Sequence, residues 1–285
     1  MKYIIFYNEC LRSKILYSKF IQQNKKNIRC VIKLPININS HNKFFLLKKG
    51  IFNNNAHSYI LFQLFQTLIY NFLSKIFSSN LENFCKKLNI NFISLKFFPD
   101  KKQIRNIVKN YDKKDIIIIS TTYILKHKDL IIKNPILNLH ESDPLKYKGS
   151  AIYFELAHQK VKYMKTVIME PNQKIDAGRI VLSSKKINIK NFSVFRIILK
   201  GYNSQSNLIK QLKNIRIKKK YPKIQNKNET EIYTFPTRKL EKSISRLRPQ
   251  SAMDFIKKKH IKKEKFNDVE LEYFNILKPN DDELT

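Results

Sequence analysis

Short apolar runs alternate along this chain with longer segments in which apolar residues recur every three or four positions. Runs of the first kind are typical of β-strands, and the periodic segments are typical of amphipathic helices. The pattern predicts strands at Tyr3–Tyr7, Cys30–Leu34, Phe92–Leu95, Ile116–Ser120, Ile136–His140, Val167–Met169 and Arg179–Ser183. It predicts helices at Leu11–Gln23, Tyr59–Phe77, Leu81–Leu88, Lys101–Asn110, Ala151–Gln159 and Phe195–Leu212.

The regular alternation of these elements favours a doubly wound α/β domain with a mostly parallel sheet. The run at Ile116–Ser120 starts with four consecutive isoleucines, as expected of a strand that is buried on both faces of such a sheet. We expect this domain to cover residues 1–214.

The character of the chain changes after residue 214. Lys218–Lys220 and Lys257–Lys259 bracket a region interrupted by prolines, and the last residues include the acidic run Asp281–Glu283. The strand pattern of this region is too weak to predict a complete β-barrel. We therefore expect residues 215–285 to form a short, basic and partly ordered C-terminal extension.

One predicted helix, Tyr59–Phe77, is apolar enough to raise the question of a membrane. It carries Gln63, Gln66, Asn71 and Lys75, whereas a spanning helix needs about 20 mostly apolar residues. The pattern favours a buried or interface helix, with peripheral membrane contact as the alternative.

The chain is strongly basic, with 56 Lys and Arg against 22 Asp and Glu, a formal net charge of +34. Such a charge favours polyanionic partners such as tRNA or phosphorylated substrates. The alternative is a compositional bias, because the lysines are spread over the whole chain.

Three cysteines lie far apart, which argues against a disulfide framework and is typical of a reduced, cytoplasmic protein.

The region that follows the first predicted strand argues against a nucleotide cofactor held in the usual way. A dinucleotide-binding fold carries a glycine-rich turn at this place, where the backbone approaches the phosphates. Here the residues are Asn8, Glu9 and Cys10, and the whole chain has only four glycines.

Candidate chemistry gathers near the strand at residues 136–140. Asn138 and His140 are two positions apart, so they point to the same face of that strand, and Asp176 precedes Gly178 in a turn before another strand. An amide, an imidazole and a carboxylate can together polarise a carbonyl and relay a proton. The alternative is that these are ordinary loop and turn residues.

A resemblance favours the chemical interpretation. The stretch Asn138–Gly149 is similar to the signature Asn-x-His-Pro-Ser-Leu-Leu-Pro-x-Tyr-Arg-Gly of the formyltransferases that use 10-formyltetrahydrofolate. Asp176–Gly178 matches the second signature of that family, Asp-x-Gly, at the family's distance from the histidine. The first stretch matches at these positions, with lysine in place of the arginine: Asn138, His140, Ser142, Tyr147, Lys148 and Gly149.

The resemblance implies a role for each matched residue. It implies catalysis by Asn138, His140 and Asp176, without a metal. It implies donor binding by the loop after the isoleucine run and by the second signature, and acceptor binding by the rest of the first signature. The implied donor-binding residues are Thr121, Thr122, Tyr123, Ile124 and Gly178, and the implied acceptor-binding residues are Ser142, Tyr147, Lys148 and Gly149.

The resemblance also implies the reaction, transfer of a formyl group from 10-formyltetrahydrofolate to a primary amine. The sequence departs from the family at Glu141, where a proline is usual, and at Asp143–Leu145, where Leu-Leu-Pro is usual. A carboxylate at position 141 changes the charge beside His140 if it faces the site. These departures affect the acceptor side more than the type of reaction.

Three interpretations of function stay open. The segment Ile232–Arg238 is similar to a Tyr-x-x-Pro-Thr segment in relatives that modify sugars, so a nucleotide-linked amino sugar is the favoured acceptor. A methionyl-tRNA formyltransferase with a reduced C-terminal region is the second interpretation, and glycinamide ribonucleotide is a further acceptor in this family. The third is a non-catalytic basic binding protein on the same fold.

Overall fold

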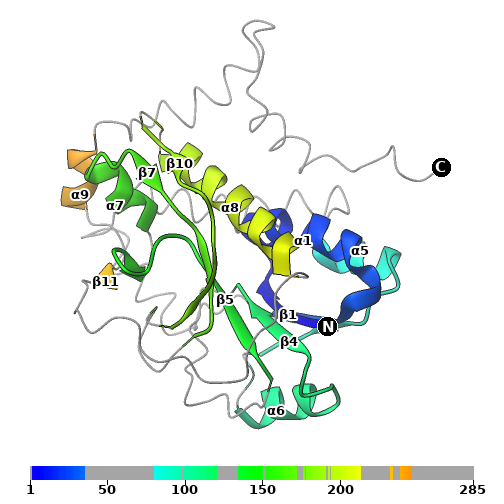
Figure 1. Ribbon diagram of the computed structural model, residues 1–285. Helices are drawn as coiled ribbons and strands as arrows, with labels where there is room; N and C mark the ends of the chain where they lie inside the picture. The colour runs from blue at the N-terminus through cyan, green and yellow to red at the C-terminus, as the bar shows by residue number, and fades with distance from the viewer. Residues whose placement is uncertain are drawn as a thin grey trace, which may run out of the picture.

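A seven-stranded sheet forms the centre of the computed structural model (Figure 1). Its order is β3-β2-β1-β4-β5-β8-β9; the first five strands run parallel, and β8 is antiparallel to both of its neighbours. The doubly wound, mostly parallel sheet expected from the sequence is confirmed. The structure describes residues 2–35, 80–97, 99, 101–120, 134–149, 152–171, 176, 178–190, 192, 194–212, 232–233 and 238–244.

Most predicted elements lie within two residues of the observed ones, and the predicted helix at Tyr59–Phe77 lies outside the described residues. The strands of the central sheet are β1 (Tyr3–Asn8), β2 (Ile28–Leu34), β3 (Phe92–Ser94), β4 (Ile116–Ile119), β5 (Ile136–His140), β8 (Val167–Met169) and β9 (Ile180–Ser183). Short strands outside it are β6 (Lys148–Gly149), β7 (Tyr163–Met164), β10 (Ile187–Asn188) and β11 (Ile232–Tyr233). The helices are α1 (Leu11–Gln23), α5 (Leu81–Lys87), α6 (Lys101–Lys109), α7 (Ile152–His158), α8 (Val194–Gln211), α9 (Arg238–Ser243) and the 3-10 turn η1 (Lys25–Asn27).

Helices cover both faces of the sheet because its strands are apolar on both sides. In β1, Tyr3, Ile5 and Tyr7 pack with α1, α5 and α8, whereas Ile4 and Phe6 pack on the other face with α6. Successive side chains of a strand point to opposite faces, so this continuous apolar run supplies two cores. Among the described residues, no helix is long and apolar enough to cross a bilayer.

The carboxyl ends of β1, β4 and β5 meet at one edge of the sheet because these neighbouring strands run parallel. Ligands of open α/β sheets bind outside this edge. β5 ends at His140, so the fold brings the first signature to the place where a ligand site is expected.

Part of the C-terminal region returns to the body of the protein. β11 pairs in parallel with β6, with Tyr233 opposite Gly149. α9 lies beside α7 (Figure 1), and Leu240 and Ile244 pack into a third core with α7 and α8. The division of the chain at residue 214 stays a prediction, but residues 232–244 are packed against the portion before it.

This packing predicts different outcomes for two truncations. A chain that ends at residue 250 keeps β11 and α9, and we expect it to retain donor binding and the Tm of the full chain. A chain that ends at residue 230 loses both elements, Leu240 and Ile244 included. The apolar side chains of α7 and α8 that these two residues cover become exposed to water, so the Tm should fall. Thermal unfolding of the two chains beside the full chain checks this, and equal Tm values would contradict it.

All three cysteines are free thiols in the structure. Burial raises the pKa of Cys10 and Cys30, and raises the pKa of Cys85 to about 12. Because the thiolate is the reactive form, we expect the folded protein at pH 8 to react with a thiol reagent at least about 10²-fold more slowly than the chain unfolded in guanidinium chloride. A thiol that reacts at the unfolded rate would contradict this expectation.

Candidate active site

His140 is the last residue of β5, and its ring is surrounded by oxygen atoms. Its Nδ1 lies 3.5 Å from Asp176 Oδ1, and its Nε2 lies 3.0 Å from the carbonyl oxygen of Tyr147. The Ser142 hydroxyl is 3.3 Å from Nε2. The side chain is buried, with 5 % of the residue exposed. An imidazolium ring can donate a proton to oxygen on both sides, whereas a neutral ring has one donor only.

Asp176 holds two parts of the site together. Its Oδ1 faces His140, and its Oδ2 accepts a hydrogen bond of 2.8 Å from the backbone N–H of Gly149. The residue has φ 48°, a left-handed conformation that aspartate tolerates better than most residues. The two signatures found in the sequence are therefore in contact, which the sequence alone could not establish.

Asn138 is the second polar residue of β5 that we predicted to be catalytic. It pairs with Ile119 of β4 and Met169 of β8, and it is half-buried. Among the described residues, its side-chain amide has no hydrogen-bond partner. The amide is on the same face of the strand as His140, because the two residues are two positions apart. A side-chain amide can donate a hydrogen bond to an oxygen atom.

The residues predicted to bind the acceptor lie in and directly after the loop that follows β5. Ser142 is buried and donates to the carbonyl oxygen of Tyr147 over 3.0 Å, which closes the loop after β5. The Tyr147 hydroxyl donates to Gln159, and Lys148 is buried. Gly149 has φ 97°, in the region that favours glycine, and contributes its N–H to Asp176.

Among the predicted donor-binding residues, only Gly178 can be described, since Thr121, Thr122, Tyr123 and Ile124 lie outside the described residues. A Cβ atom at Gly178 would collide with the carbonyl oxygen of Glu170. The glycine is therefore required by the close approach of two backbone segments. Among the described residues, no three His, Cys, Asp or Glu side chains could hold a metal ion together.

Sequence analysis missed a charged pair near the Asp-x-Gly turn. Arg179 donates two hydrogen bonds, of 3.1 and 2.7 Å, to the carboxylate of Glu170. The backbone N–H of Glu170 donates to the carbonyl of Arg179 as well. These contacts close the base of the β8–β9 hairpin, which carries Asp176 in its turn. The available signal was an acidic residue directly after one predicted strand and a basic residue at the start of the next.

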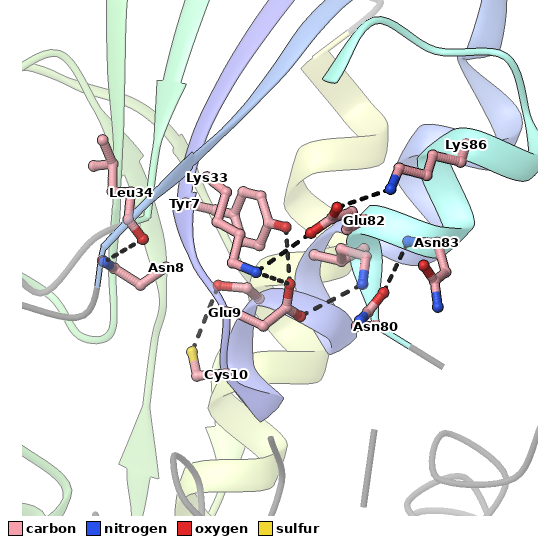
Figure 2. Close-up of polar contacts among 12 residues, drawn as sticks. Tyr7, Asn8, Glu9, Cys10, Lys33, Leu34, Asn80, Glu82, Asn83 and Lys86 are labelled. Carbon is pink, nitrogen blue, oxygen red and sulfur yellow. Dashed lines mark hydrogen bonds and ion pairs between the residues drawn. The ribbon is translucent and has the colours of Figure 1, made fainter. Parts of the chain in front are cut away.

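A second polar cluster lies at the carboxyl end of β1 (Figure 2). The buried carboxylate of Glu9 accepts hydrogen bonds from Tyr7 over 2.9 Å and from the N–H of Leu81 over 3.4 Å, and Lys33 lies 4.0 Å away. The Asn8 amide donates to the carbonyl of Pro35 over 2.8 Å. These hydrogen bonds connect the end of β1 to β2 and α5. The negative charge of Glu9 also opposes binding of a phosphate at the start of α1.

No family model and no curated protein matches the sequence. Among solved structures, phosphoribosylglycinamide formyltransferase from Anaplasma phagocytophilum superposes with a TM-score of 0.51 at 12 % identity, covering 81 % of this chain and 97 % of that one. The protein has the formyltransferase fold. The identity is too low for this similarity to show more than the fold.

Two sugar-modifying enzymes are also similar in structure. A sugar N-formyltransferase from a Shewanella species superposes with a TM-score of 0.49 at 12 % identity, covering 82 % of this chain and 77 % of that one. An N-formyltransferase from Helicobacter canadensis, in complex with folinic acid and dTDP-3-aminofucose, has a TM-score of 0.48 at 16 % identity, covering 82 % and 71 %.

Proposed function

We propose that this protein is an enzyme that transfers a formyl group from 10-formyltetrahydrofolate to a primary amine of a small acceptor. The observation that carries the proposal is the contact of His140 with Asp176 at the carboxyl edge of a sheet with the formyltransferase fold. The two sequence signatures of the folate-dependent formyltransferases supply these two residues. Asn138, the third polar residue of the signatures, lies two positions before His140 in β5.

The reaction assigns a task to each of these groups. The amine nitrogen attacks the formyl carbon, the bond from that carbon to the folate nitrogen breaks, and one proton passes from the amine to the folate nitrogen. The formyl oxygen gains negative charge in between, which the Asn138 amide and the His140 Nε2–H stabilise as donors. Nε2 lies 3.0 Å from the Tyr147 carbonyl oxygen, so this contact has to open or be shared when Nε2–H donates to the formyl oxygen.

Asp176 orients the imidazole and takes part in the proton relay. Its Oδ1 faces Nδ1, which fixes the ring so that Nε2 points away from the aspartate. General acid–base catalysis by a positioned group of this kind contributes about 10²- to 10⁴-fold to a rate.

The acceptor that we favour is a nucleotide-linked amino sugar. The segment that is similar to sugar-modifying relatives, Ile232–Arg238, includes β11, and β11 pairs with β6 beside Gly149. This pairing supports the assignment because it sets the segment next to the first signature. Phosphoribosylglycinamide is the second candidate, since the solved structure that superposes with a TM-score of 0.51 is a phosphoribosylglycinamide formyltransferase. We find no such support for tRNA.

The test is release of tetrahydrofolate from 10-formyltetrahydrofolate by the purified protein with a panel of acceptors. The panel contains nucleotide-linked amino sugars, glycinamide ribonucleotide and charged initiator tRNA. We expect turnover with one acceptor, abolished in His140→Ala and kept in His158→Ala, which removes an exposed histidine of α7. No turnover and no donor binding would refute the proposal in favour of a non-catalytic binding protein.

A further inference from the structure

Arg12, in the first turn of α1, reaches the end of the strand that carries the candidate catalytic residues. Its Nη1 lies 3.1 Å from Glu141 Oε1, and its Nη2 donates to the carbonyl oxygen of Leu139 over 3.1 Å. Leu139 stands between Asn138 and His140 in the sequence. The guanidinium group therefore contacts the backbone between these two residues and the side chain directly after them.

The guanidinium group is itself held from behind by α8. Nη2 also donates to Gln205 Oε1 over 3.4 Å, and the centre of the Tyr202 ring lies 5.7 Å from the guanidinium carbon. Arg12 is 9 % exposed, and Gln205 is fully buried. An arginine held in this way has a fixed position relative to α1 and α8. Because it also donates to the Leu139 carbonyl, it couples the position of β5 to these two helices.

Arg12 contacts β5 directly after its last described pair with β4. Among the described residues, the ladder between β4 and β5 extends to Ile119 opposite Asn138, and Leu139 follows this pair. On the other side, β8 still pairs with β5 up to Val167 opposite His140. The hydrogen bond from Arg12 gives the Leu139 carbonyl a donor just beyond the last described β4–β5 pair.

Glu141 stands where the formyltransferase signature has a proline. A proline fixes its own φ and restricts the residue before it, which stiffens the chain after the histidine. Glutamate has neither effect on the backbone. Instead, the contact of its side chain with Arg12 restrains position 141. The carboxylate that the sequence places directly after His140 is thus paired with the cation of Arg12.

We propose that Arg12 is a positioning residue for formyl transfer, which holds residues 139–141 so that Asn138 and His140 face the reacting groups together. The inference rests on the proposed function for its kinetic consequence, but the contacts that carry it do not depend on that function. The planar fork of arginine can donate to a carboxylate and a carbonyl at the same time. Lysine keeps the charge but offers no fork, so it should replace arginine only in part.

The experiment compares Arg12→Met and Arg12→Lys with Arg29→Met in the full chain. Arg29 pairs with Asp115 over 3.3 Å at the amino ends of β2 and β4, and therefore matches the change without touching the site. We expect kcat of Arg12→Met to fall about 10- to 100-fold, because small displacements of catalytic groups are costly. Its KM for the donor should change less than about twofold. Arg12→Lys should lie between Arg12→Met and wild type, and Arg29→Met should keep the wild-type kcat.

A second readout, independent of turnover, separates this inference from the proposed function. The ring ¹H–¹⁵N NMR signals of His140, assigned with His140→Gln, should shift in Arg12→Met and stay in place in Arg29→Met. If wild type transfers no formyl group, the proposed function fails while this readout still tests the positioning role. Unchanged His140 signals in Arg12→Met would overturn the inference. So would an unchanged kcat in Arg12→Met, or an equal loss in Arg29→Met.

Discussion

Asp176→Asn should lower kcat for formyl transfer by about 10²-fold or more, with little change in folding. Asparagine has the same shape and can still accept the hydrogen bond from Gly149, so the loop should keep its place. It cannot present a negative charge to His140 Nδ1, which now lies 3.5 Å from a carboxylate oxygen. Removing the charge therefore acts on the ring and not on the fold.

Steady-state kinetics of Asp176→Asn beside Asp143→Asn checks this prediction. Asp143 lies in the loop after β5, and its side chain accepts the N–H of Leu145 in a local turn that asparagine also forms. Wild-type kcat in Asp176→Asn would exclude the proposed role of the carboxylate. An equal loss in Asp143→Asn would show that the effect is not specific to the Asp176 carboxylate.

The second large effect is expected from Gly178→Ala. An added Cβ atom would collide with the carbonyl oxygen of Glu170 and lie 2.7 Å from its carbonyl carbon, so the backbone itself must move. Overpacking of this kind typically costs about 1–3 kcal/mol of stability. The turn that moves also carries Asp176, so kcat should fall further than the loss of stability explains.

Thermal unfolding and kinetics of Gly178→Ala are best compared with Ile209→Val. Ile209 of α8 is buried in the core between the helix and the sheet. Replacing it by valine should lower the free energy of unfolding by about 0.5–1.5 kcal/mol without changing the site. We expect a lower Tm in both variants but a lower kcat only in Gly178→Ala, measured well below either Tm. A Gly178→Ala variant with wild-type kcat would show that the position of the turn does not matter for the reaction.

Long elements were predictable from the sequence because their patterns are local. The isoleucines of β4 can only be buried, and the period of α1 gave both of its ends as observed. The two residues of β6 and of β11 have no period that could be detected. Their pairing joins parts of the chain more than 80 residues apart and depends on the folded body between them.

The candidate site was predictable only in part, for a similar reason. The residue types of the two signatures were sufficient to propose Asn138, His140 and Asp176, but their contact depends on the β8–β9 hairpin. Arg12 could not be found, because a charged residue in an amphipathic helix is usually solvated. Its burial depends on Glu141 and Gln205, which lie far along the chain.

The pairing of β6 with β11 has a consequence for synthesis on the ribosome. A nascent chain forms contacts only among residues that have already emerged, and domains generally fold as units during synthesis. All seven strands of the central sheet lie before residue 184, whereas Tyr233 comes fifty residues later. The sheet can therefore assemble while the strand beside Gly149 still lacks its partner, which emerges only after the last strand of the sheet.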